Sequence, residues 1–150
     1  MRWHRILVFI GAALALGLTW NALSGRGFAL ARNVYLKPGD EVIDVVEAKR
    51  RFDKHAALFL DARPRLNFQF ERIPGALSLP EDDFDAAFAA LEPTLRARYD
   101  IVVYCSGFGC EASHIVARRL KEKGIPAVVL QDGIPAWQDA KYPVETPARP

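Results

Sequence analysis

The chain has 150 residues, of which 25% are charged and 51% hydrophobic, and its formal net charge is +2. This length suits one compact domain, and the composition is that of a globular protein and not of a disordered tail. Arg2 and Arg5 supply the excess positive charge, so the rest of the chain is neutral and lacks a basic surface for nucleic acid. Two cysteines are too few for a disulfide framework or a four-cysteine zinc site.

An apolar segment opens the chain. Residues Ile6 to Leu18 include no polar side chain, and residues 19–23 extend the run less strongly. A membrane-spanning helix needs about 17–25 apolar residues and a signal-peptide core about 7–15, so this length falls between the two. Trp20 stands where an interfacial aromatic would anchor a retained helix, and we therefore expect residues 1–24 to be a membrane anchor with residues 6–23 in the membrane. The alternative is a signal segment that is cleaved near Ser24, which would leave a secreted protein.

Both alternatives predict the same topology. Arg2 and Arg5 precede the apolar run, and a short basic N-terminus is expected to stay inside the cell. Arg26 and Arg32 follow the run and weaken this argument. The soluble domain is then expected outside the cytoplasm, which in a bacterium means the periplasm.

The remaining chain alternates short apolar runs with amphipathic segments. Residues 25–40 are predicted to be a linker, residues 41–145 the domain and residues 146–150 a tail. Buried strands are predicted at Ala56–Leu60, Ala76–Leu79, Ile101–Tyr104 and Ala127–Leu130. One helix is predicted to begin at Asp44, and the others to span residues 81–83 to Pro93, about residue 112 to Lys123, and Asp132 to Trp137. Apolar strands that alternate with helices indicate an α/β fold with a mostly parallel central sheet covered on both faces.

The segment after the third strand is the strongest candidate for chemistry. Cys105 follows Tyr104 directly, at the end of a strand where ligands bind in open α/β sheets. Gly107 and Gly109 allow the loop to curl, so that its N–H groups converge before the next helix. A thiolate there is stabilised by these donors and by the helix dipole. The alternative is a buried structural cysteine that happens to end a strand.

Four separated segments of the chain resemble those of the rhodanese-like domains. They are Leu60-Asp61-Ala62-Arg63, Arg72-Ile73-Pro74-Gly75-Ala76, Val103-Tyr104-Cys105 and Asp132-Gly133-Ile134-Pro135-Ala136-Trp137. The sequence departs from the family pattern at Arg72, where histidine is usual, and at Asp132, where a first glycine is usual. The resemblance covers about residues 41–145 and implies a three-layer α/β/α fold.

The resemblance also implies a sulfurtransferase without a cofactor or a metal. Cys105 would take a sulfane sulfur from a small-molecule or protein persulfide donor, hold it as a persulfide and pass it to a thiol acceptor. The substrate-binding loop would consist of Ser106, Gly107, Phe108, Gly109, Cys110 and Glu111. Asp61 and Arg63 are expected to support this loop from beneath and to take no part in the chemistry.

The loop differs from the usual family loop in its charge. No cation lies between Cys105 and Arg118, and the loop carries Glu111 instead. A carboxylate about 6 Å from the thiolate, at an effective dielectric near 20, would oppose ionisation by roughly 2.8 kcal/mol. We therefore expect poor use of thiosulfate. Phosphatase chemistry of the related cysteine-dependent enzymes is also disfavoured, because Glu111 stands where they need an arginine.

The second cysteine leaves several alternatives open. Cys110 could form a disulfide with Cys105, could resolve a persulfide on Cys105 and release sulfide, or could pack inward as a small apolar group. A metal site of Cys105, Cys110 and His114 is disfavoured because only three ligands are present at irregular spacing. The function expected from the sequence is sulfur transfer through Cys105. The alternative is a binding or redox-sensing module that uses the two cysteines without turnover.

Overall fold

The structure is a computed structural model that describes residues 3–23, 36–97, 100–107 and 109–146. The chain divides into two compact units, Met1–Val34 and Tyr35–Pro150. In the first unit, α1 (Trp3–Leu23) is a helix over the predicted apolar segment. Within the described part of the chain, no helix combines the length and the apolar character needed to cross a membrane. The predicted anchor at residues 6–23 therefore gains no support from the structure. The proposed cleavage point at Ser24 lies outside the described residues.

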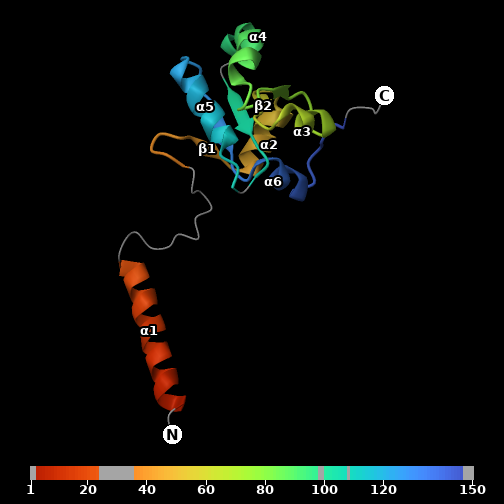
Figure 1. Cartoon of the computed structure of the whole chain (residues 1–150). Coiled ribbons are helices and arrows are strands. Elements are labelled where there is room, and N and C mark those ends of the chain that lie inside the picture. Colours follow the sequence, from red (N-terminus) through yellow and green to blue (C-terminus); the bar gives the residue numbers. More distant parts are fainter. Residues whose placement is uncertain (1–2, 24–35, 98–99, 108, 147–150) are drawn as a thin grey trace. The chain divides into compact units, whose positions relative to one another are not determined.

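The second unit is built on a five-stranded parallel sheet (Figure 1). Its strands are β1 (Val42–Ile43), β2 (Leu58–Asp61), β3 (Leu77–Ser78), β4 (Ile101–Tyr104) and β5 (Val128–Leu130), in the order β1-β5-β4-β2-β3. The helices are α2 (Val45–Asp53), α3 (Arg65–Phe70), α4 (Phe84–Arg96), α5 (Ala112–Glu122) and α6 (Gly133–Asp139). The predicted α/β class with a central parallel sheet is confirmed.

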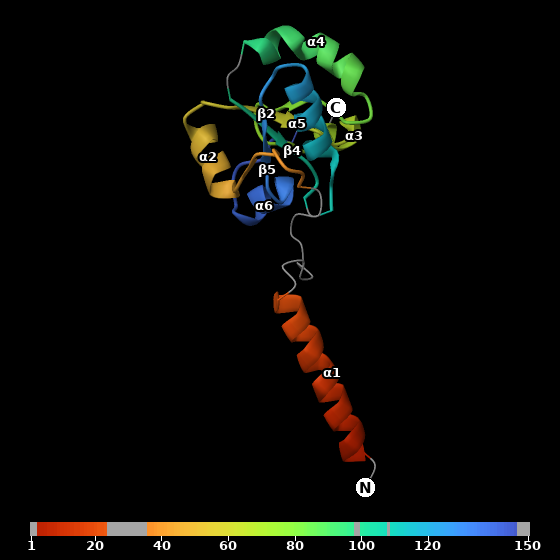
Figure 2. The ribbon, with the colours of Figure 1, turned by 90° about the vertical axis from the view of Figure 1, so that its left-hand side faces the viewer.

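Successive residues of the central strands face two separate cores. Leu60 and Val103 pack in one core with residues of α4 and α5. Phe59 and Val102 pack in the other with Ala48 of α2 and residues of α6. The sheet thus lies between two helical layers, which the turned view also shows (Figure 2). This arrangement explains why the central strands are almost entirely apolar, since helices cover both of their faces.

Local interactions set the ends of several helices. The carboxylate of Asp44 accepts the backbone N–H of Glu47 at 2.8 Å and begins α2 as predicted. After α5, Gly124 has a φ of +78°, and the N–H of Ile125 bonds back to the carbonyl of Leu120.

The sequence prediction was wrong at two places in the helical layers. Pro93 lies inside α4 and does not end it, because the last turn carries Leu95, which is fully buried in the core. The short helix α3 was not predicted. Two of its apolar residues, Leu66 and Phe70, are exposed, so the segment has no clear amphipathic pattern.

Candidate active site

The carboxyl ends of β2 and β4 place the predicted site residues side by side. In the pairing of these strands Asp61 lies opposite Tyr104, and the N–H of Ala62 donates to the carbonyl of Tyr104 at 2.9 Å. Cys105 therefore begins its loop next to the segment that carries Asp61 and Arg63. This is the strand edge at which parallel α/β sheets bind their ligands.

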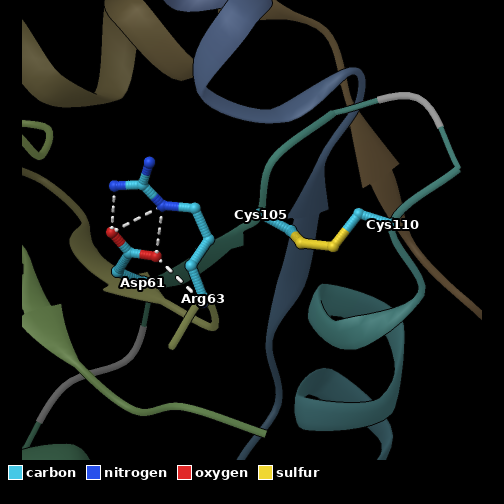
Figure 3. The surroundings of a disulfide bond; sticks show 4 residues. All are labelled: Asp61, Arg63, Cys105 and Cys110. Atoms are coloured by element: carbon cyan, nitrogen blue, oxygen red, sulfur yellow. Dashed lines mark hydrogen bonds and ion pairs between the residues drawn. A yellow bond between two sulfur atoms is a disulfide. The ribbon is translucent and has the colours of Figure 1, made fainter. Parts of the chain in front are cut away.

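Cys105 is joined to Cys110 by a disulfide bond (Figure 3). The Cα atoms of the two cysteines are 6.3 Å apart, within the range of about 4.4–6.8 Å that disulfides adopt. Cys105 is 2% exposed, whereas Cys110 is half-buried. The expected free thiolate is thus absent from this state of the protein. Of the alternatives for Cys110, packing as a free apolar side chain is wrong.

The loop between the cysteines is folded by its glycines. Gly107 and Gly109 have φ values of +99° and +80°, a region that residues with a side chain rarely adopt. The N–H of Cys110 donates to the carbonyl of Gly107 at 3.0 Å and closes the turn that brings the second cysteine back. Ser106 is exposed at the start of this loop. Phe108 lies outside the described residues.

The start of α6 holds the cysteine loop from the other side. The N–H of Ile134 donates to the carbonyl of Cys105 at 2.9 Å. A Cβ atom on Gly133 would lie 2.2 Å from that carbonyl oxygen and 2.7 Å from the backbone nitrogen of Gly107. Asp132 adopts a left-handed φ of +58°, which aspartate tolerates better than most residues and which suits a position usually held by glycine. The sequence marked this segment as a family motif but did not reveal its contact with the loop.

Asp61 and Arg63 form a buried ion pair beside the disulfide (Figure 3). Asp61 is fully buried and Arg63 is 4% exposed. The Arg63 guanidinium donates to the Asp61 carboxylate from Nε at 2.9 Å and from Nη2 at 2.7 Å, and Nη2 also donates to the carbonyl of Glu71 at 2.6 Å. The guanidinium carbon lies 5.7 Å from the ring centroid of Tyr104, the residue before Cys105. The pair thus lies beside the start of the cysteine loop, and its supporting role stays a prediction.

Tyr104 is fixed at its hydroxyl end as well. The phenolic oxygen accepts the backbone N–H of Ile73 at 3.2 Å. Burial raises the pKa of Tyr104 well above its ordinary range, and the Asp61 carboxylate adds to this effect. The phenol therefore stays protonated and acts as a structural group in the wall behind the cysteine loop.

A charged cluster lies on α5 next to the loop. Glu111 is 40% exposed, and its carboxylate accepts from Arg118 at 3.4 Å, while Arg118 donates to Asp40 at 3.0 Å. The Nδ1 atom of His114 lies 3.4 Å from the same Asp40 oxygen. Glu111 is thus engaged with a cation, which reduces the repulsion that it would exert on a thiolate.

The pKa values of Asp40 and His114, the two half-buried members of this cluster that share the contact, are both depressed. Burial lowers the pKa of His114, and the attraction of Asp40 only partly opposes it. Burial raises the pKa of Asp40, but the backbone N–H of Lys37 and the Arg118 guanidinium outweigh this and hold the pKa below its usual value. Asp40 is therefore ionised and His114 neutral at neutral pH.

Two of the cavities lined by the described residues differ in their position relative to Cys105. One of about 250 Å³, lined partly by Asp100, Ile101 and Val128, lies at the amino ends of β4 and β5, away from Cys105. The other, of about 300 Å³, is lined by Arg63, Glu71 and three residues of α3, so it adjoins the Asp61–Arg63 pair. Within residues 3–23, 36–97, 100–107 and 109–146, no group of three His, Cys, Asp or Glu side chains is arranged to hold a metal ion.

Comparison with known proteins identifies the family. Residues 44–140 match the family model of the rhodanese-like domain. The chain belongs to the rhodanese-like domain family. This match covers all four segments on which the resemblance was based, and it includes the strand that carries Cys105.

Solved structures agree with this assignment. The rhodanese-like domain of an Anabaena protein is 27% identical, with a TM-score of 0.59, covering 74% of this chain and 87% of that one. A thiosulfate sulfurtransferase from Pseudomonas aeruginosa is 25% identical with a TM-score of 0.61, covering 77% of this chain and 22% of that one. The BH2092 protein of Bacillus halodurans shares the fold. It is 20% identical with a TM-score of 0.65, covering 71% of this chain and 77% of that one.

One relative is a longer protein. The HTH-type transcriptional regulator Rv0324 of Mycobacterium tuberculosis is 29% identical over 117 residues, which is 78% of this chain. The chain spans half the length of that relative. The chain is thus similar both to part of a protein described as a thiosulfate sulfurtransferase and to part of a protein described as a transcriptional regulator.

Proposed function

We propose that this rhodanese-like domain transfers sulfane sulfur through a persulfide on Cys105. The observation that carries the proposal is the position of Cys105, which directly follows β4 and begins the glycine loop before α5, beside the buried Asp61–Arg63 pair. In the proposed reaction the reduced Cys105 thiolate attacks the outer sulfur of a donor persulfide, R–S–SH. The donor thiolate leaves, and the sulfur remains on Cys105 as Cys–S–SH until an acceptor thiolate removes it.

The disulfide requires that the enzyme be reduced before it can accept sulfur. Reduction frees Cys105 at the N-terminal end of α5, where the helix dipole and the loop N–H groups favour a thiolate. We propose a neutral or protein-bound persulfide as the donor, because the loop supplies Glu111 and no cation to a dianion such as thiosulfate.

Intact-mass measurement tests the proposal directly. The full chain carrying Cys110→Ser, which cannot form the disulfide, is freed of reductant and incubated with glutathione persulfide. The expected result is a gain of the mass of one sulfur atom, which the Cys105→Ser variant does not show and which a thiol acceptor removes. Failure of every persulfide donor to add sulfur to correctly folded, reduced protein would refute sulfur transfer.

The disulfide favours a second candidate function, in which the domain senses redox state or binds a partner without turnover. In that case the oxidised and reduced forms would differ in partner binding, and neither would carry sulfur. The mass experiment separates the two candidates, because only the transferase gains a sulfur atom.

The same disulfide supports a proposed location outside the cytoplasm. Disulfides persist in oxidising compartments and are rare where glutathione and thioredoxin keep thiols reduced. The apolar segment that follows Arg2 and Arg5 in the sequence agrees with such a location. Two measurements on protein from its native host test this proposal. Its mass, compared with that of the full chain, shows whether residues 1–24 are retained. The number of its free thiols shows whether Cys105 and Cys110 are oxidised.

A further inference from the structure

The two cysteines differ in how firmly the fold holds them. Cys105 is buried, and its carbonyl is bonded to Ile134 at the start of α6. Cys110 is half-buried and lies at the end of a glycine turn. The backbone of Cys105, and with it a persulfide on this residue, is thus held in place. The Cα atoms of Cys105 and Cys110 are 6.3 Å apart, so the Cys110 thiol can reach Sγ of Cys105.

We propose that Cys110 is a resolving cysteine, so that the protein reduces persulfides and releases hydrosulfide. This inference rests on the proposed formation of a persulfide on Cys105. The Cys110 thiolate attacks the inner sulfur, Sγ of Cys105, and the bond from that sulfur to the outer sulfur breaks. The electron pair of the broken bond leaves with the outer sulfur as HS⁻. The remaining bond is the Cys105–Cys110 disulfide, the state that the structure holds.

An external dithiol completes the cycle. Thiol–disulfide exchange depends on access to the attacked sulfur, and Cys110 is the more exposed of the two. The first thiolate of the dithiol therefore attacks Cys110, forms a mixed disulfide there and releases Cys105 as a thiolate. The second thiolate of the reductant then frees Cys110. In total, one persulfide and one dithiol give one thiol, one hydrogen sulfide and one oxidised dithiol.

The helix after the loop favours the reduction step. When the dithiol attacks Cys110, Cys105 Sγ leaves as a thiolate from Cys110, which lies two residues before α5, and the N-terminal dipole of that helix favours negative charge.

The sulfide-releasing step has an alternative. Attack by Cys110 on the outer sulfur would move the persulfide to Cys110, expel Cys105 as a thiolate and release no sulfide. The two routes have different products, so they can be separated by experiment.

A single-turnover experiment with the full chain tests the inference. Reduced wild type, Cys110→Ser and Cys105→Ser are freed of reductant without oxygen, mixed with glutathione persulfide, and separated quickly from excess donor. Sulfide and free thiols are then measured over time, together with the intact mass. Correct folding of each variant is checked by circular dichroism, and Cys110→Ala serves as a second variant that lacks the resolving thiol.

Wild type is expected to release one sulfide per chain and to lose both thiols as the disulfide forms. Both Cys110 variants are expected to keep the added sulfur and to release sulfide only when an external thiol is supplied, and Cys105→Ser is expected to gain no sulfur. The resolving role is overturned if wild type keeps its persulfide as long as Cys110→Ser does, or if the Cys110 variants release sulfide as fast as wild type. If the Cys110 variants fold but never gain sulfur, sulfur transfer itself is refuted and the resolving role with it.

Discussion

The buried ion pair beside the loop predicts a large and specific loss of stability. In Asp61→Asn the side chain keeps its size but loses its charge, so the Arg63 guanidinium stays buried at 4% exposure without an opposite charge. Three donor groups of Arg63, the backbone N–H, Nε and Nη2, make four hydrogen bonds to this carboxylate, and all four lose their charge assistance. Removing one partner of a buried pair costs about 3–5 kcal/mol.

That loss is a large share of the total, because the free energy of unfolding of a domain is about 5–15 kcal/mol. Urea unfolding of the oxidised full chain, followed by tryptophan fluorescence, measures it as a shift of the midpoint. The matched control is Asp139→Asn, an exposed carboxylate at the end of α6, which should change the free energy of unfolding by less than about 0.5 kcal/mol.

A second variant separates charge burial from simple loss of contacts. Replacing the whole pair, as in Asp61→Leu with Arg63→Met, removes both charges and should recover most of the stability lost in Asp61→Asn. The reasoning is refuted if Asp61→Asn costs no more than the exposed control, or if the double variant is less stable than the single one.

The other predictions concern the loop and its neighbours. Reduced protein should turn over thiosulfate and cyanide slowly, because no lysine or arginine lies between Cys105 and Arg118 to bind the dianion, and turnover typical of efficient rhodaneses would contradict this. Gly133→Ala should lower the free energy of unfolding by at least about 2 kcal/mol, because the new Cβ atom clashes with the Cys105 carbonyl. The control is Gly124→Ala, whose Cβ atom meets no atom within 4 Å and which should cost about 1 kcal/mol. Urea unfolding measures both values. Because the folded protein depresses the pKa of His114, the unfolded chain binds the proton more readily, and stability should fall as pH drops below about 6.5. Denaturation across this pH range should show a weaker pH dependence in His114→Gln.

Strong local patterns were sufficient to predict much of this fold. Ile101–Tyr104 is apolar and largely β-branched, and it forms β4 with the predicted ends. Asp44 begins α2 because the contact that it makes is only three residues away. By contrast, β1 has two residues, too few to show any periodicity, and it was not predicted.

The site could be predicted only in part, because its decisive contacts join distant segments. Cys105, Asp61 and Arg63 were identified from motifs, and the strand pairing brings them together. Spacing alone left several possibilities for Cys110, since the fold of a glycine loop determines whether the sulfur atoms meet. The contact between Gly133 and the Cys105 carbonyl links two loops far apart in sequence, and no local pattern reveals it.

Both outer strands of the sheet, β1 and β3, are only two residues long. The unpaired N–H and C=O groups along an outer strand are a template on which another chain can add, and very short outer strands are one way that natural proteins prevent this. The three longer strands, β2, β4 and β5, lie inside the sheet with a neighbour on each side. The sheet therefore offers little backbone for aggregation, even though its central segments would aggregate readily if exposed.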